Sequence, residues 1–141
     1  MPGWVMWALA SACFAAMTAV FAKVGVASVS PDVATLIRTV VILAVLGAIV
    51  TATGEIRQAA GASARTYAFL ILSGLATGAS WLCYFRALSV GDAARVAPLD
   101  KLSVVLVAVF SVLFLGERLS VVNWLGIGLI GAGAWLVTLR L

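Results

Sequence analysis

Five apolar stretches, each about 20 residues long, constrain this chain more than any other feature of its sequence. They run approximately over residues 4–27, 33–53, 67–88, 96–115 and 121–139. Each is long enough to cross the hydrocarbon core of a bilayer, roughly 30 Å, as a helix. None shows the strict alternation that a transmembrane strand needs. We therefore predict an all-α integral membrane protein with five transmembrane helices, organised as a single domain over residues 1–141.

The composition agrees with a membrane location. Of the 141 residues, 65% are hydrophobic and only 10% are charged, whereas about a quarter of the residues of a soluble domain carry charge. The net charge of +4 is explained by contact with lipid headgroups and by topology, because no basic cluster suggests nucleic acid. The N-terminal MPGWVMW has no positive region before its apolar run, so we expect a retained helix, not a cleaved signal peptide.

Several kinds of catalytic and metal site are excluded by what the sequence lacks. It has no histidine, and Cys13 and Cys83 are expected at depths of about 13 Å and about 24 Å from the same membrane face. That difference argues against a disulfide between them and against an ordinary zinc site. No G-x-S-x-G elbow or phosphate-binding loop is present. We expect neither an enzyme nor a bound cofactor or metal.

Short polar connections separate the apolar stretches. Ser30 followed by Pro31 predicts a helix N-cap with proline at the first helical position. Gly116 predicts a helix end, and Ser120 a new start. The longest connection, residues 54–66, is too short for a domain outside the membrane.

Charged residues near or within the spans gather toward the membrane face opposite the N-terminus. They are Lys23, Arg38, Arg86, Asp100 and Lys101. Because four of the five are cationic, they could receive a carboxylate or phosphate group. Two alternatives are that the long side chains reach out to lipid phosphates, or that the charges form a structural salt-bridge network. Lys101 is turned about 100° from Asp100 on a helix, so we do not expect these two residues to pair.

Polar and small residues mark further helix faces. In the third span Ser73, Thr77, Ser80 and Tyr84 share one face, with Trp81 beside them. This face either lines a polar cavity or packs against a helix, since hydroxyls often bond the carbonyl four residues earlier. The glycines expected to allow close helix packing are Gly74, Gly78, Gly126, Gly128, Gly131 and Gly133.

The basic residues do not favour one orientation in the membrane. Arg57, Arg65 and Arg118 lie on the N-terminal side. When Lys23, Arg38 and Lys101 are treated as embedded, the opposite side also has three: Arg86, Arg95 and Arg140. This balance permits insertion in both directions.

Several segments together resemble the EamA domain of the drug/metabolite transporter superfamily. The similarity lies in Phe21–Gly25, Pro31, Ala34–Thr39, Gly74, Trp81, Tyr84–Leu88, Ala97–Ser103, Phe114–Ser120 and Trp124–Gly133. The resemblance covers essentially the whole chain. It implies a small-molecule transporter, often an exporter, with a central cavity between two five-helix repeats and alternating access. Most relatives hold both repeats in one chain, the second inverted, whereas this chain has one.

The resemblance implies an assembly as well as a function. Five spans place the termini on opposite faces, so an inverted repeat requires a second chain inserted the other way. We expect an antiparallel homodimer, or pairing with a sister half-transporter, in a bacterial or archaeal cytoplasmic membrane. The alternative is a non-transporting scaffold or accessory half-subunit that binds lipid headgroups or a partner half-transporter.

The candidate substrate-binding or gating residues are Lys23, Arg38, Thr77, Trp81, Tyr84, Arg86, Asp100 and Lys101. Small multidrug-resistance relatives use a glutamate deep in the first helix, but residues 11–17 contain no carboxylate here. We therefore expect an anionic, zwitterionic or neutral polar substrate and not a lipophilic cation.

Overall fold

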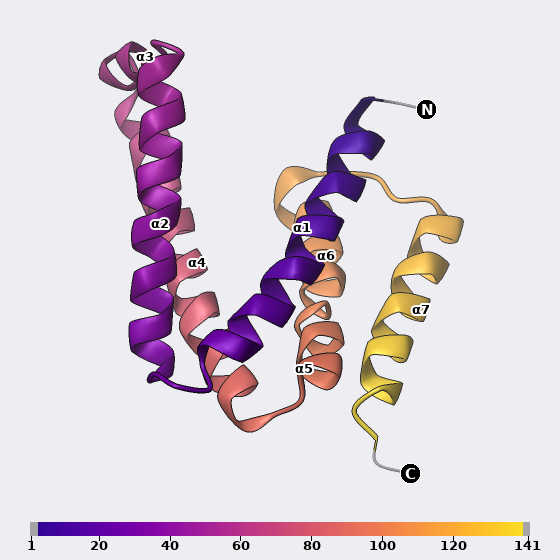
Figure 1. The fold of residues 1–141 in the computed structure, drawn as a ribbon. Helices are drawn as coiled ribbons and strands as arrows, with labels where there is room; N and C mark the ends of the chain where they lie inside the picture. The colour runs from indigo at the N-terminus through magenta and orange to yellow at the C-terminus, as the bar shows by residue number, and fades with distance from the viewer. Residues whose placement is uncertain (1–2, 140–141) are drawn as a thin grey trace. The chain divides into compact units, whose positions relative to one another are not determined.

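The computed structural model describes residues 3–139, which are mostly helical and contain no strand. The helices are α1 (Gly3–Gly25), α2 (Pro31–Ala52), α3 (Ile56–Ala60), α4 (Ala64–Val90), α5 (Ala93–Asp100), α6 (Ser103–Leu115) and α7 (Val121–Leu136) (Figure 1). Four stretches are long and apolar enough to cross a membrane: α1, α2, α4 and the combined run of α5 and α6. The predicted all-α membrane class is confirmed.

The predicted helix ends are confirmed at three connections. Ser30 caps α2, its side chain accepting the Val33 N–H at 3.4 Å, and Pro31 is the first helical residue. Gly116 ends α6 with φ of 69°, a left-handed conformation that glycine adopts without steric cost. Ser120 caps α7 by accepting the Asn123 N–H at 3.2 Å.

Three boundaries differ from the prediction. The fourth apolar stretch is not one helix, because the N–H groups of Lys101 and Leu102 bond carbonyls only three residues earlier, in a tight turn just after Pro98. Pro98 itself removes one helical hydrogen bond. The fifth helix has 16 residues, because the chain again turns tightly at Thr138. The connection over residues 54–66 contains the short helix α3.

The chain divides into two compact units. One, the terminal unit, comprises residues 3–19 and 90–139; the other, the hairpin unit, comprises residues 20–89. The expectation of a single domain stays a prediction.

Small residues form the helix contact of the terminal unit. Helix α7 packs against α6 and α5, and Ala108 and Ala134 are buried there. A Cβ atom added to Gly131 would lie 3.2 Å from the Val105 side chain. Without a side chain at this position, the two backbones approach closely, as at many helix contacts in membranes.

The remaining glycines expected at helix contacts lie open in a single copy. Among the described residues, no atom beyond the glycine's own helix lies within 4 Å of an added Cβ at Gly74, Gly78, Gly126, Gly128 or Gly133. Within its own unit, none of these five glycines lies at a close helix contact.

The hairpin unit is built on α2 and α4, which run side by side with α3 at their far end (Figure 1). The Tyr67 hydroxyl donates to the Ala59 carbonyl at 2.5 Å and ties α3 to α4. At the opposite end Thr35, Phe85 and Leu88 are buried. Beyond this end the apolar side chains of both helices are exposed, as expected of helices that face lipid or another chain.

Gly131→Val should lower the free energy of unfolding by about 1–3 kcal/mol, because the added atoms must displace Val105 in a packed contact. SDS-induced unfolding in mixed micelles, followed by far-UV circular dichroism, measures this change. The matched control Gly128→Val, in the same helix, should change the free energy by less than about 1 kcal/mol. Equal losses for the two variants would contradict the close contact at Gly131.

Candidate functional site

Four charged side chains meet at one end of the hairpin unit, which we call the cationic end. Lys23 lies in the last turn of α1, and Asp32 lies in the first turn of α2. Arg38 lies about two turns into α2, and Arg86 is four residues from the end of α4. Because α2 begins where α4 ends, an antiparallel pair brings these positions to the same level. The cationic end holds three cations and one carboxylate.

Lys23 is held by the backbone of α4. Its ammonium donates to the Leu88 carbonyl at 2.7 Å. Leu88 lies in the last turn of α4, where the final carbonyls have no partner within the helix. A cation there also interacts favourably with the negative end of the helix dipole. Since Leu88 is fully buried, this contact stabilises the helix end instead of leaving Lys23 to extend toward lipid.

Arg86 forms an ion pair with Asp32. The two atoms Nη2 and Oδ1 lie 3.1 Å apart, and Nη2 also reaches Oδ2 at 3.2 Å. Both side chains are more than half exposed, at 64% and 60%. An exposed pair contributes little stability. It shows that the beginning of α2 lies beside the end of α4, where burial of Thr35, Phe85 and Leu88 stabilises the contact.

Arg38 stacks on aromatic rings. Its guanidinium carbon lies 4.2 Å from the centre of the Trp81 ring and 5.6 Å from that of Phe85. Trp81, Phe85 and Leu88 follow one another at helical spacing and so share the face of α4 that meets α2. In the described part of the chain, the Arg38 side chain has neither a carboxylate partner nor a hydrogen bond. Its N–H donors therefore stay available to an anionic group.

The polar face of α4 lies beside this contact. Thr77 donates to the Ser73 carbonyl at 2.9 Å, the local bond that hydroxyls in membrane helices often make. Ser73, Thr77 and Ser80 are exposed in a single copy, whereas Tyr84 and Trp81 are half-buried. The other helices of the hairpin unit leave this face open.

Asp100 and Lys101 belong to the terminal unit, and the expectation that they would not pair is wrong. Lys101 Nζ lies 3.2 Å from Asp100 Oδ2. The expectation assumed a continuous helix, but α5 ends at Asp100 and Lys101 lies in the tight turn that follows. The flexible lysine stem then reaches the neighbouring carboxylate, so the charges of this pair offset each other locally.

Besides Asp32, three uncharged residues of the cationic end were not among the predicted site residues: Thr35, Phe85 and Leu88. They form the buried part of the contact between α2 and α4. The i, i+4, i+7 spacing of Trp81, Phe85 and Leu88 is the pattern that could have indicated them. Arg140, used in the charge count, lies outside the described residues.

A family model described as the EamA-like transporter family matches residues 2–139. The chain belongs to this family. A protein from a Sinorhizobium species named "Uncharacterized transporter in cobO 3'region" is 67% identical to this EamA chain over 134 residues, which cover 95% of each sequence. No solved structure matches it.

Membership of the EamA family makes this chain a membrane transporter of the drug/metabolite kind. The family and the relative's name point away from an enzyme. Across residues 3–139, no group of three or more His, Cys, Asp or Glu side chains is arranged to hold a metal ion. The cationic end presents charged hydrogen-bond donors beside aromatic rings.

Lys23→Met should lower the free energy of unfolding by about 1–3 kcal/mol, because it leaves the buried Leu88 carbonyl without this donor. Lys23→Arg keeps a donor and should recover part of the loss. The control Asp32→Asn removes a charge from an exposed pair and should cost less than about 1 kcal/mol. SDS unfolding of the purified protein compares the three variants. A loss for Asp32→Asn as large as that for Lys23→Met would rule out the ranking.

Proposed function

We propose that this chain is a half-size exporter of a small anionic or zwitterionic solute. Two copies, inserted in opposite directions in a bacterial cytoplasmic membrane, enclose the substrate pathway and work by alternating access. The observation that carries the proposal is the open polar face of α4 in a single copy. Ser73, Thr77 and Ser80 are exposed there among apolar side chains. Thr77 satisfies its donor within the helix, but the Ser73 and Ser80 hydroxyls, which make no hydrogen bond within the described residues, would lack hydrogen bonds if they faced lipid.

An antiparallel second copy is supported by the number of apolar helices. The four candidate spans and the shorter apolar helix α7 together make five crossings in this proposal, which would place the two ends of the chain on opposite membrane faces, so an inverted repeat needs a partner inserted the other way. The relative matches over 95% of its own length, so it is about as long as this chain. Five glycines with no neighbour in a single copy leave room for such a partner.

Arg38 is the residue best suited to bind the substrate. Trp81 and Phe85 cover its guanidinium face, which restricts its rotamers, while its N–H edge stays free to hydrogen-bond an oxyanion. A planar guanidinium binds carboxylate or phosphate oxygens in pairs. Lys23 is fixed at the same end by the Leu88 carbonyl and adds positive potential that favours an anionic group, whereas the charge of Arg86 is offset by Asp32.

Arg38→Gln should reduce solute flux about tenfold, because it removes one charged hydrogen-bond donor group from the pathway. Proteoliposomes loaded with a defined mixture of organic acids and amino acids, with efflux followed by mass spectrometry, provide the measurement. Arg57→Gln in α3 is the matched control and should leave flux unchanged. If wild-type vesicles release no solute faster than protein-free vesicles, the alternative of an accessory, non-transporting subunit is favoured.

If the chain inserts in both directions, each end of α2 lies on the outer face of the membrane in about half of the molecules. We would replace Cys13 and Cys83 by alanine and introduce either Ser28→Cys or Gln58→Cys, which are exposed positions near opposite ends of α2. A membrane-impermeant thiol reagent added outside cells should label about half of each variant. Complete labelling of one variant with none of the other shows a single orientation and excludes the antiparallel homodimer.

A further inference from the structure

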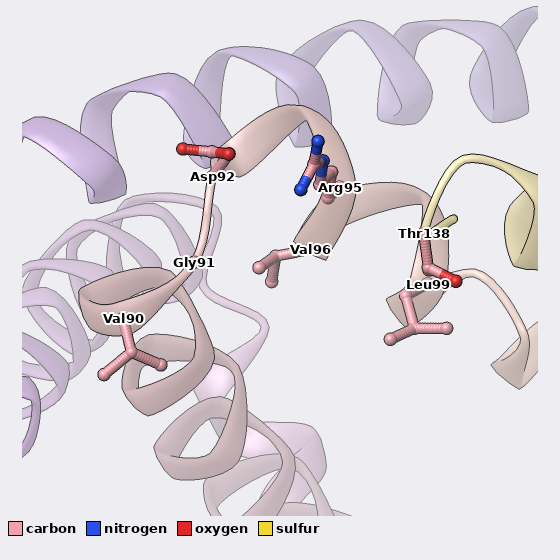
Figure 2. Close-up of a pocket in the computed structure, with 7 residues that line it drawn as sticks. All are labelled: Val90, Gly91, Asp92, Arg95, Val96, Leu99 and Thr138. Atoms are coloured by element: carbon pink, nitrogen blue, oxygen red, sulfur yellow. The ribbon is translucent and has the colours of Figure 1, made fainter. Parts of the chain in front are cut away.

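A pocket of about 330 Å³ lies in the terminal unit, beside the connection that leads into α5 (Figure 2). Its polar lining consists of Asp92, Arg95 and Thr138. Val90, Val96 and Leu99 supply its apolar lining. None of these residues belongs to the cationic end or to the polar face of α4.

The pocket presents two opposite charges that do not neutralise each other. Asp92 is the N-cap of α5, and Arg95 follows three residues later. The Asp92 backbone carbonyl accepts the N–H groups of Arg95 at 2.9 Å and of Val96 at 3.0 Å, which fixes the backbone between the two charges. Within residues 3–139, neither charged side chain makes an ion pair or a hydrogen bond. Both are therefore available to a ligand that carries two charges.

Apolar lining lies beside the two charges. Asp92 and Arg95 stand at the start of α5, and Leu99 is one turn further along the helix, about 6 Å beyond Arg95. In Figure 2 Asp92 lies on the loop before α5 and Arg95 on its first turn, and the apolar residues Val90, Val96 and Leu99 are drawn below them. A matching ligand has a zwitterionic head and an apolar tail.

The geometry points to a binding site for a zwitterionic phospholipid with a primary ammonium group, such as phosphatidylethanolamine. Arg95 binds the phosphate oxygens, since guanidinium hydrogen bonds to phosphate are strong and directional. Asp92 accepts hydrogen bonds from the ammonium. Thr138, whose hydroxyl donates to the Trp135 carbonyl at 2.6 Å, lies beside Leu99. The start of the acyl chain covers Val96 and Leu99. This assignment is independent of the transport proposal.

Native mass spectrometry of the full chain, with phosphatidylethanolamine or phosphatidylglycerol added, tests the two charges separately. Asp92→Asn should weaken phosphatidylethanolamine binding about tenfold and leave phosphatidylglycerol binding unchanged, because only the first lipid carries an ammonium. Asparagine is an equally good N-cap, so α5 is retained. Arg95→Gln should weaken the binding of both lipids.

Glu55→Gln and Arg57→Gln, at exposed positions of the α3 segment, are the matched controls for headgroup attraction and should leave both affinities unchanged. Water-soluble glycerophosphoethanolamine tests whether the headgroup binds without its acyl chains. Displacement of the lipid shows that the headgroup alone is bound, and no displacement shows that an acyl chain is required. Unchanged phosphatidylethanolamine binding in Asp92→Asn, an equal loss for phosphatidylglycerol, or equal losses in the controls would overturn the assignment.

Discussion

The hydrogen bond from the Lys23 ammonium to the Leu88 carbonyl organises the end of the hairpin unit on which the candidate site depends. Leu88 is fully buried, and a helix-terminal carbonyl without a partner is costly away from water. By satisfying that carbonyl, Lys23 fixes the end of α1 against the end of α4. The start of α2 joins them through Asp32 and Arg86. Three helix ends thus meet around Leu88 and Phe85, and Arg38 is positioned against Trp81 as a result.

Outside these few buried contacts, most side chains of the described residues are exposed. The terminal unit is joined through Gly131, Ala108 and Ala134, whose small size lets α6 and α7 approach closely. The rest of the helix surface is mostly exposed apolar side chains. In lipid this exposure carries no hydrophobic cost, so burial within one copy does not need to be extensive. The polar face of α4 and most glycines of α7 belong to this exposed surface.

The interruption between α5 and α6 shows where sequence reasoning failed. The sequence reasoning took residues 96–115 as one helix and so placed Asp100 and Lys101 on different faces. The carbonyls of Pro98 and Leu99 accept bonds from residues only three positions later, and the resulting turn lets the two neighbours pair. Periodicity assumes a regular helix, and it fails where the backbone tightens.

The sequence alone determined the membrane class, the approximate helix limits and the caps at Ser30, Gly116 and Ser120. These features depend on hydrophobic length and on hydrogen bonds within three or four residues, which are local properties of the chain. Only the tertiary structure decided the partners of Lys23, Arg38 and Arg86, because long flexible side chains can reach a carbonyl, an aromatic ring or a carboxylate equally well. The group that each side chain meets depends on which helix ends come together. The two residues of the Asp32–Arg86 pair, and those of the Lys23–Leu88 pair, are more than 50 residues apart in the sequence.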